Sequence, residues 1–396
     1  MSQILSRIGR RLKPLEVLNR RFWMAALRRI WRNRPLERKL QAQDLRRVLF
    51  LRYDAIGDMI TTLPAFALLK RLNPSVAIDV MASPRNRRVI EMDPNVDRII
   101  ELGPGLGGLL RAVREARRRR YDAIICAIFG RSSKVGIIAN LIGGRRAVKG
   151  TIWKSDAYNA YFNVQSRSAA VLQSMWDRVP HVLRDVIDID PEAVSIHPYL
   201  AVGEASRNNA ARRLRETAAG HGPYLLMNLS VSHQRNVWPA DKYERLAVLL
   251  RERYPLIPLL LLAMPNDRSL ADRLVARCGA GGMVSAYPPT RDVLEVAAVV
   301  ERCVMLFSSD TGVVHMASAT HRPVAAMYAG HVAATDWGPY GVPCRMLVSA
   351  DADSIASITV EDAFAACCDL VELGIAGPAS ERLGGSVLPD PASLPA

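Results

Sequence analysis

The sequence lacks the features that mark a metal finger, a secreted protein or a membrane span. Its six cysteines form no CxxC pair, and no histidine lies near them at zinc-ligand spacing. We therefore expect reduced thiols in a cytosolic protein. No apolar run reaches the ~18–20 residues that cross a bilayer. The N-terminus also lacks the apolar stretch and cleavage site of a secretory signal.

Hydrophobic residues make up 49% of the chain and charged residues 23%, whereas aromatic residues are scarce at 6%. This is the composition of an ordinary globular protein, and it excludes wholesale disorder and a collagen-like structure. At ~100–200 residues per domain, a chain of 396 residues predicts two domains, each large enough to bury a core.

Positive charge is concentrated at the N-terminus. The formal net charge is +15, and residues 1–47 contain 14 Lys or Arg against three acids. Arginine pairs alternate there with apolar residues such as Phe22, Trp23 and Trp31. The pattern is typical of an amphipathic helix on an anionic lipid surface. A solvated helix that packs its apolar residues on the protein body fits equally well. Nucleic acid is the least favoured partner, because no reading module accompanies the charge.

Two series of short apolar strands alternate with helical stretches along the rest of the chain. The first predicts strands at 48–52, 77–82, 98–102 and 121–129, with helices through Leu72 and over 111–120. The second predicts strands at 224–230, 257–265, 303–309 and 323–330, with helices near 240–252, 266–278, 291–300, 312–320 and 360–373. Such repeats form parallel sheets. We therefore expect an α/β protein with an extension (1–47), two Rossmann-like domains (48–210 and 211–375) and a disordered tail (376–396).

The segment 308–330 predicts a site for a diphosphate. A buried strand ends at Ser309, and the chain turns through Asp310, Thr311 and Gly312 into a helix that carries His315. The first amides of a helix have no internal partner and attract negative charge. Open α/β sheets also bind ligands at the carboxyl ends of their strands. Thr311 and His315 add two side-chain donors. The alternative is a plain helix cap beside a surface histidine.

The segment 51–65 places Gly57 and Asp58 where the first strand passes into the first helix. Asp58 is either a helix cap or a carboxylate at the sheet edge that takes a proton from an acceptor hydroxyl.

Three further patterns imitate known sites. Gly103, Gly105 and Gly108 spell the dinucleotide fingerprint G-x-G-x-x-G, but they follow the third strand, and the next strand carries no acid for a ribose. The pairs Asp188-x-Asp190 and Asp351-x-Asp353 imitate a D-x-D metal site, and we assign no metal to them. The arginine run 117–120 indicates a solvated helix end that could equally touch a membrane.

Together, the two turns make the chain resemble glycosyltransferase family 9, the ADP-heptose:lipopolysaccharide heptosyltransferases. The opening pattern of that family is present as Arg52, Gly57, Asp58, Thr62 and Pro64. Its D-T-G-x-x-H signature is present as Asp310, Thr311, Gly312 and His315. The segments 93–100 and 337–341 and the pair Trp238-Pro239 also match, so the resemblance spans roughly 48–345.

This resemblance implies the GT-B fold, in which two Rossmann-like domains face each other across a cleft, and it makes Asp58 the catalytic base. It places on the acceptor side Gly57, Arg52, Arg131 and Lys134. It places on the donor side Asp310, Thr311, Gly312, His315, Ser230 and Arg235. No metal or other cofactor is implied. The family's lysine two residues before the W-P pair is Asn236 here, and Arg235 could substitute because guanidinium binds phosphate.

The implied activity is an inverting, metal-independent transfer of a heptose or related sugar. Its donor would be a nucleotide sugar, expected to be ADP-heptose, and its acceptor a lipopolysaccharide core or similar lipid-linked saccharide. Residues 1–47 would hold the enzyme on the anionic cytoplasmic face of the inner membrane. The alternative is a non-catalytic, nucleotide-sugar-binding scaffold at the membrane, which the missing lysine leaves open. A nicotinamide-dependent oxidoreductase is a weaker option that needs the glycine triplet to be a true fingerprint.

Overall fold

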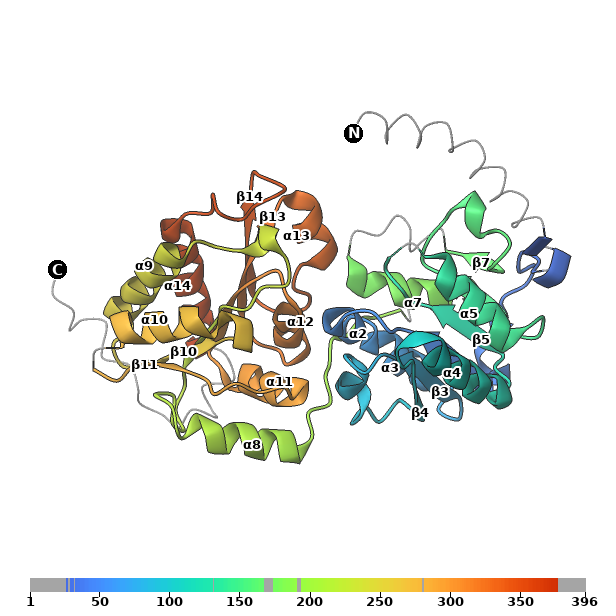
Figure 1. The fold of residues 1–396 in the computed structure, drawn as a ribbon, viewed down its shortest axis with the longest axis horizontal. Coiled ribbons are helices and arrows are strands. Elements are labelled where there is room, and N and C mark those ends of the chain that lie inside the picture. Colours follow the sequence, from blue (N-terminus) through green and yellow to red (C-terminus); the bar gives the residue numbers. More distant parts are fainter. Residues whose placement is uncertain are drawn as a thin grey trace. The chain divides into compact units, whose positions relative to one another are not determined.

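The fold, known from a computed structural model, consists of two compact units (Figure 1). Unit 1 is Met1–His197 and unit 2 is Pro198–Ala396. The structure describes residues 26–27, 29–31, 33–130, 132–166, 174–190, 194–279 and 281–376. Each unit contains a six-stranded parallel sheet, which confirms the predicted α/β class.

The sheet of unit 1 has the strand order β4-β3-β2-β5-β6-β7. Its strands are β2 (Arg47–Leu51), β3 (Ala77–Ala82), β4 (Arg98–Glu101), β5 (Ala123–Cys126), β6 (Val148–Thr151) and β7 (Val164–Gln165). Its helices are α2 (Ile56–Ile60), α3 (Leu63–Leu72), α4 (Gly105–Arg119), α5 (Ser133–Gly143) and α7 (Met175–Val186). The short segments β1 (Leu40–Gln41) and β8 (Ile187–Asp188) pair with each other outside this sheet.

The sheet of unit 2 has the order β11-β10-β9-β12-β13-β14. Its strands are β9 (Leu225–Asn228), β10 (Leu259–Leu262), β11 (Val284–Ala286), β12 (Met305–Ser309), β13 (Val324–Ala329) and β14 (Cys344–Ser349). Its α-helices are α8 (Glu204–Leu214), α9 (Ala240–Arg253), α10 (Arg268–Cys278), α11 (Val293–Arg302), α12 (Gly312–Ala319), α13 (His331–Trp337) and α14 (Val360–Ala376). A 3-10 turn, η5 (Gln234–Asn236), lies between β9 and α9.

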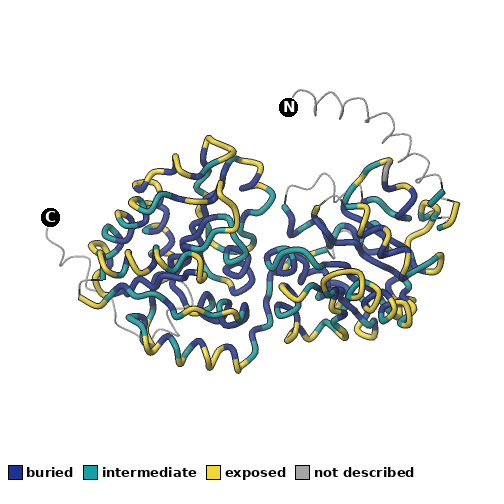
Figure 2. Tube along the Cα trace, in the orientation of Figure 1, coloured by how far each residue is buried: buried dark blue, intermediate teal, exposed yellow. Residues whose placement is uncertain are grey.

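Several inner strands of the two sheets are continuous apolar runs. Residues 48–51 of β2 and all residues of β5, β10 and β13 are buried, which Figure 2 shows as dark blue segments. Strands of a parallel sheet are buried on both faces, because crossover helices cover both. This is why unbroken apolar runs, rather than alternating ones, located these strands in the sequence.

The helix expected to run through Leu72 is in fact two helices, α2 and α3. The break lies at Thr61 and Thr62, and Pro64 occupies the first turn of α3. Proline has no N–H to bond back to the preceding turn, so it fits the start of a helix and not its interior. The break leaves α2 as a single short turn that presents Asp58.

Residues 33–47 belong to unit 1, so the predicted extension 1–47 is too long. The Asn33 amide donates to Asn140 Oδ1 at 2.8 Å and to the Ala160 carbonyl at 2.9 Å. Buried Lys149 donates from Nζ to Asn33 Oδ1 at 3.1 Å. The Trp31 ring lies 5.4 Å from that of Tyr161, so this aromatic packs on the protein body.

The remainder of that predicted segment, including Phe22 and Trp23, lies outside the described residues. So does the predicted disordered tail beyond Ala376. In the part of the chain that the structure describes, no helix has the length and apolarity to cross a membrane.

The predicted domain boundary at 210/211 falls inside α8. This helix belongs to unit 2, where Ser206 Oγ donates to Asp292 Oδ2 at 3.2 Å and Arg207 forms an ion pair with Glu301 at 2.8 Å. Unit 2 therefore begins earlier than expected, at Pro198.

Candidate active site

Both sheets reverse their strand order at one point, and the two candidate turns lie at these points. In unit 1, β3 and β4 lie on one side of β2 and β5 lies on the other. In unit 2, β10 and β11 lie on one side of β9 and β12 lies on the other. Ligands of open α/β sheets bind at such reversals, outside the carboxyl ends of the strands. The turns after β2 and β12 are therefore the expected ligand-binding edges.

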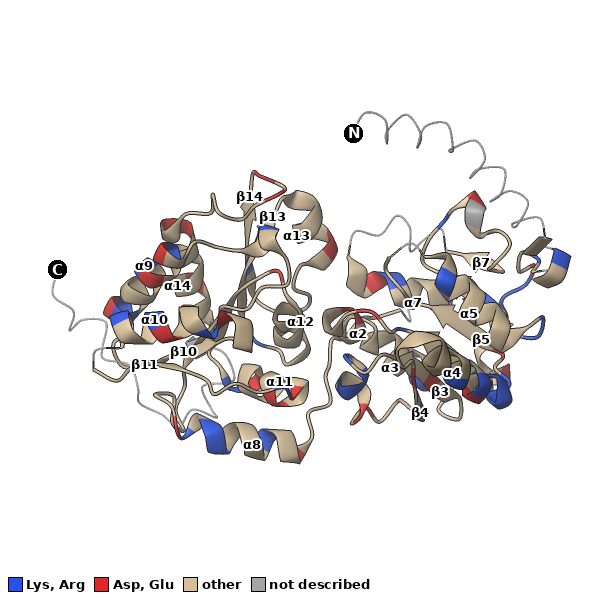
Figure 3. Cartoon of the chain, viewed as in Figure 1, with Lys and Arg blue, Asp and Glu red and all other residues tan. Residues whose placement is uncertain are grey.

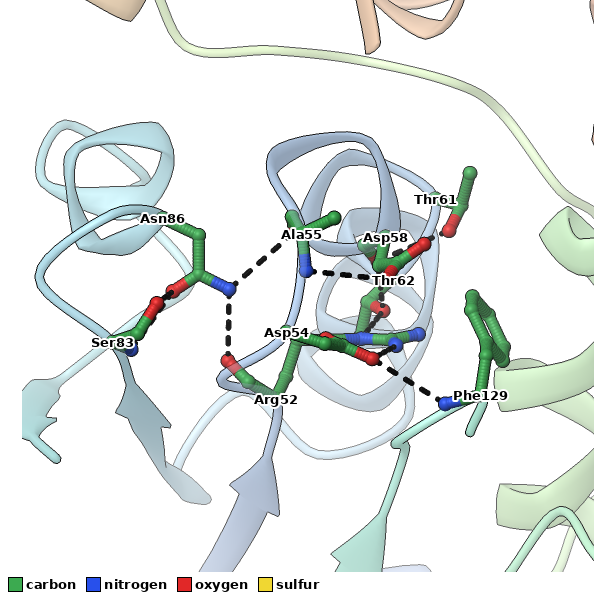
Figure 4. A network of polar contacts seen from close by, with 9 residues as sticks. All are labelled: Arg52, Asp54, Ala55, Asp58, Thr61, Thr62, Ser83, Asn86 and Phe129. Atoms are coloured by element: carbon green, nitrogen blue, oxygen red, sulfur yellow. Dashed lines mark hydrogen bonds and ion pairs between the residues drawn. The ribbon is translucent and has the colours of Figure 1, made fainter. Parts of the chain in front are cut away.

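Arg52 organises the turn after β2 from a fully buried position (Figure 4). Its Nε donates to Thr62 Oγ1 at 2.8 Å, and its Nη1 forms an ion pair with Asp54 Oδ2 at 2.9 Å. The guanidinium also lies 3.9 Å from the centre of the Phe129 ring, just beyond β5. These contacts hold the turn after β2 in place. That Arg52 lies on the acceptor side remains a prediction.

Asp58 is half-buried in the single turn of α2. Its Oδ2 accepts the backbone N–H of Ala55 at 3.2 Å, and its carbonyl accepts the hydroxyls of Thr61 and Thr62 at 3.0 and 2.8 Å. The side chain of Asp58 thus bonds to the backbone at the start of its own helix, but the N-cap position of α2 is occupied by Ala55. A carboxylate has two oxygens with about four acceptor sites, so one amide bond leaves Asp58 able to accept a proton.

Asp54 is the functional candidate that sequence reasoning missed. It pairs with Arg52 and accepts the Phe129 N–H at 3.4 Å, which links the turn after β2 to the end of β5 (Figure 4). Burial raises the pKa of Asp54 to about 6, Arg52 counteracts the rise, and the charge and hydrogen bond of Asp58 add to it. Two carboxyl groups that share a site cannot both ionise easily. The sequence did contain a signal for this residue, since Asp54 is an acid that lies two residues after the predicted strand 48–52.

The expected acceptor side also contains Tyr53 and Lys134. Exposed Lys134 lies in the first turn of α5, and its Nζ lies 5.8 Å from the centre of the Tyr53 ring. These two residues, with Ser83 and the segment 102–106, line a hollow of about 480 Å³. A cation and an aromatic face beside the Asp58 turn suit an anionic saccharide. Gly57 is buried in α2, and Arg131 lies outside the described residues.

In unit 2, buried Asn228 fixes the turn after β12. Its Nδ2 donates to Ser308 Oγ at 3.0 Å and to Thr311 Oγ1 at 3.2 Å, which joins the ends of β9 and β12. Thr311 is the N-cap of α12, but its side chain makes no cap hydrogen bond. The amides of Gly312 and Val313 begin the helix and have no intrahelical partner. The Thr311 hydroxyl bonds inside the protein, so the backbone amides are the donors that remain available.

His315 is buried, with 3% of its surface exposed, which excludes the alternative of a surface histidine. Its ring lies 6.0 Å from that of Trp337 in α13. Burial lowers the pKa of His315 to about 4. The imidazole is therefore neutral near pH 7 in this structure and carries one N–H donor without positive charge.

Arg235 and Asn236 lie in η5 next to this turn. Buried Asn236 donates from Nδ2 to the Asp310 carbonyl at 2.9 Å and thereby anchors η5 to the end of β12. The side chain of Arg235 is exposed. Half-buried Ser230 accepts the Met264 N–H at 2.7 Å, and its hydroxyl can still donate its own proton. Asn236 thus holds the turn in place, and Arg235 is the neighbouring cation.

The turn after β12 lies within a region that matches a known family. The sequence profile of glycosyltransferase family 9 (heptosyltransferase) matches residues 109–363, which is more than half of the chain. The chain belongs to glycosyltransferase family 9. It is therefore a glycosyltransferase, as the sequence predicts.

Individual relatives agree with the family assignment. Lipooligosaccharide heptosyltransferase 2 of Haemophilus influenzae is 22% identical over 289 residues, which cover 69% of this chain and 80% of the relative. The glycosyl transferase family 9 structure from Veillonella parvula has a TM-score of 0.71 at 16% identity and covers 84% of this chain and 99% of its own. ADP-heptose lipopolysaccharide heptosyltransferase II of E. coli has a TM-score of 0.69 at 17% identity and covers 83% and 100%. These similarities confirm the GT-B fold.

The glycine triplet of this family 9 member has a structural role. It follows β4, the edge strand of its sheet, and not β2 at the reversal. A Cβ on Gly108 would lie 2.5 Å from the carbonyl carbon and oxygen of Gly103, so the start of α4 packs directly on the loop before it.

The aspartate pairs also have local partners. Asp351 accepts the Asp353 N–H at 2.8 Å, and Asp188 accepts the Gln41 side chain at 3.2 Å. Among the described residues, no three His, Cys, Asp or Glu side chains cluster as a metal site would require.

Proposed function

We propose that this family 9 enzyme transfers a heptose, or a related sugar, from ADP-heptose to a lipopolysaccharide-core or similar lipid-linked acceptor, with inversion at the anomeric carbon. The observation that carries the proposal is the pair of strand-order reversals. One presents a carboxylate, Asp58, and the other presents the first amides of α12. An inverting transfer needs one base and one site for a leaving diphosphate. The name of the E. coli neighbour, ADP-heptose lipopolysaccharide heptosyltransferase II, supports the choice of donor and acceptor.

Asp58 acts on the acceptor in unit 1. Its carboxylate takes the proton of the acceptor hydroxyl while that oxygen bonds to the anomeric carbon of the sugar. Lys134 and Tyr53 bind the anionic saccharide in the hollow beside the Asp58 turn. Asp54 holds Arg52 and fixes the turn, so it is a positioning residue that does not touch the substrate.

The donor diphosphate binds in unit 2 at the start of α12. As the bond from the anomeric carbon to the phosphate oxygen breaks, the leaving ADP takes the electron pair and its charge. The amides of Gly312 and Val313, together with the positive end of the helix dipole, stabilise this charge. Arg235 adds a cation, and the Ser230 hydroxyl adds a donor. These groups perform the task that a metal performs in other glycosyltransferases, so the proposed reaction needs no metal and no other cofactor.

Asp310 and His315 support this cradle. The Asp310 carbonyl accepts from Asn236, and its own N–H donates to the Met327 carbonyl at 3.0 Å. Neutral His315 carries one N–H, and the proposed reaction uses it for orientation and not for charge.

The test is release of nucleoside diphosphate from a panel of sugar donors. ADP-heptose, UDP-glucose and GDP-mannose are each offered with a lipopolysaccharide-core acceptor, with and without EDTA. We expect ADP release from ADP-heptose that requires the acceptor and survives EDTA. Binding of ADP-heptose without turnover on any core acceptor would instead favour the non-catalytic scaffold.

We further propose that the enzyme works on the cytoplasmic face of the inner membrane, with residues 1–32 as a basic anchor. The segment contains nine Lys or Arg and one acid, Glu16, and each basic residue near an anionic surface contributes ~1 kcal/mol. Full-length protein with Arg10, Arg11, Arg20 and Arg21 changed to Gln should bind anionic vesicles more weakly than wild type. Equal binding would remove this anchor from the proposal.

A further inference from the structure

One face of α4 has a charge pattern that the proposed reaction does not use. The helix contains five arginines and one acid, Glu115, within Gly105–Arg119. Ala112, Val113 and Ala116 pack into the core of unit 1, and the opposite face is exposed. Figure 3 shows the basic residues gathered along this helix.

Two of the five arginines are committed to protein partners. Arg119 donates from Nε and Nη2 to the carboxylate of buried Asp79, at 2.8 and 3.1 Å. Arg117 donates to the Leu141 carbonyl at 3.2 Å. These two residues attach the end of the helix to the sheet and to α5, so they are not available to a ligand.

The other three arginines, Arg111, Arg114 and Arg118, are exposed and have no hydrogen-bond or ion-pair partner among the residues that the structure describes. They surround a hollow of about 560 Å³, together with Gly107, Leu110 and the ion pair between Arg98 and Glu115. The acid among these lining residues is therefore already neutralised, at an N–O distance of 3.1 Å. Three unopposed guanidinium groups around one hollow match the charge of phosphate groups.

Exposed leucines continue the same face toward the start of the helix. Leu106 is 69% exposed and Leu110 is 44% exposed. With Arg114 and Arg118 they follow one another at intervals of four residues, so they form a single stripe along the helix. The stripe is apolar in its first half and basic in its second. Leucine and arginine on one face are the combination with which a surface helix binds an anionic bilayer.

We propose that this face of α4 docks on the surface of an anionic phospholipid bilayer. Arg111, Arg114 and Arg118 bind lipid phosphates, and Leu106 and Leu110 enter the boundary between headgroups and acyl chains. This surface is distinct from residues 1–32, and it rests on the proposed use of a lipid-linked acceptor, which it deepens. Leu106 also lines the hollow that contains Tyr53 and Lys134, so docking at α4 brings the membrane surface next to the acceptor side of unit 1.

The test is co-sedimentation of the full-length protein with vesicles of phosphatidylglycerol and phosphatidylethanolamine. The variant has Arg111, Arg114 and Arg118 changed to Gln. A matched control changes Arg245, Arg273 and Arg291 of unit 2 to Gln, because these are also exposed arginines without an ion-pair partner among the described residues. Both variants lose three positive charges, and residues 1–32 are unchanged in each.

We expect the α4 variant to bind about a hundredfold more weakly at low salt, at about fivefold per arginine, and the control to bind within a few-fold of wild type. A second variant, Leu106→Ser with Leu110→Ser, should lose the part of binding that persists at about 0.5 M salt, where attraction between charges is largely screened. Wild-type binding by the α4 variant, or an equal loss in the control, would overturn the proposal and leave α4 as a solvated helix face.

A soluble acceptor distinguishes loss of membrane docking by α4 from failure of the proposed transfer reaction. Transfer to a water-soluble core saccharide without its lipid should be unchanged in the α4 variant, because these arginines lie outside the hollow with Lys134. An unchanged melting temperature shows that the variant folds. A loss of transfer to the soluble saccharide would place these arginines in the catalytic machinery and would contradict a docking role.

Discussion

Two carboxyl groups, Asp54 and Asp58, lie in the turn after β2, and burial together with the nearby Asp58 controls when Asp54 carries charge. The pKa of Asp54 is raised to about 6, mainly by burial and further by Asp58. Above that pH Asp54 is charged and can only accept hydrogen bonds. Below it, protonated Asp54 can donate a hydrogen bond to Asp58, which weakens Asp58 as a base.

The variant Asp54→Asn tests this coupling. In wild type we expect kcat/KM to fall as the pH drops below about 6. The amide that replaces the Asp54 carboxyl group does not titrate, so the variant should have lower activity above the inflection and should lose the inflection itself. The measurement is a pH–rate profile, with the exposed acid variant Asp351→Asn as control. An unchanged inflection in Asp54→Asn would show that Asp54 does not influence the base.

The variant His315→Gln tests whether the buried imidazole is neutral. Its folded pKa of about 4 lies below the ordinary value of 6.5, so between these pH values only the unfolded state takes up the proton. Stability from this group is therefore complete above the ordinary pKa and is lost as the pH falls toward the folded one, by about 3 kcal/mol in total. Urea unfolding at several pH values should show a shallower pH dependence for the variant. Parallel curves for the two proteins would contradict the burial of a neutral imidazole.

The sequence identified Asp58 and the turn Asp310–Gly312, because both follow predicted strands and precede predicted helices. It did not identify Asp54 or Asn228. Each of these two residues forms a hydrogen bond with a residue that belongs to another strand. Asp54 accepts the N–H of Phe129, which follows β5, and Asn228 donates to Ser308 in β12. Such pairings depend on strand order, which a single sequence does not specify.

At the scale of elements, the start of α4 depends on two glycines that differ only in their surroundings. A Cβ on Gly108 would lie 2.5 Å from the backbone of Gly103, whereas a Cβ on Gly107 would meet nothing within 4 Å. We expect Gly108→Ala to lower the free energy of unfolding by about 1–3 kcal/mol through forced backbone movement.

The matched control is Gly107→Ala, which should raise the free energy of unfolding by roughly 0.5–1 kcal/mol, since alanine is the better helix former. Urea denaturation of the full chain measures both. If the two variants had the same stability, packing would not be the reason for glycine at position 108.

The turn η5 offers a test of whether Arg235 is the cation of the proposed donor site. Arg235 is exposed beside the start of α12, and Asn236 is fixed to the Asp310 carbonyl. Loss of one charged hydrogen bond costs roughly 1.5–3 kcal/mol, so Arg235→Gln should weaken ADP binding about 10- to 100-fold in a calorimetric titration. The control Arg245→Gln, an exposed arginine in α9, should not. Equal affinity in both variants would remove Arg235 from the donor site.

Strands made up mainly of apolar residues were predicted from the sequence, whereas strands that mix apolar with polar or charged residues were not. The strands β2, β3, β9, β10, β12 and β13 consist mainly of buried apolar residues and match their predicted positions within about three residues. The sequence analysis missed β6, which contains Lys149 and Gly150, and the partly exposed edge strand β14. Lys149 is tolerated in β6 because its Nζ donates to the carbonyls of Gly144 and Ala147, at 2.7 and 2.9 Å.

At the scale of the whole molecule, the two units repeat one arrangement. Each has a six-stranded parallel sheet with the same strand order and one reversal of that order, although α2 follows the first strand of its sheet, β2, and α12 follows the fourth, β12. The sequence predicted this duplication from the two series of apolar runs. It misplaced the junction because α8 is too polar to be recognised as part of the second unit.

The central claim is that the two turns serve one reaction, with Asp58 as its base and α12 as its diphosphate site. The most direct measurement is ADP release from ADP-heptose with a core acceptor, by wild type and by Asp58→Ala, together with ADP binding by calorimetry. We predict that Asp58→Ala loses about 10²–10⁴-fold in turnover and binds ADP as wild type does. Turnover near the wild-type rate in Asp58→Ala would contradict the account.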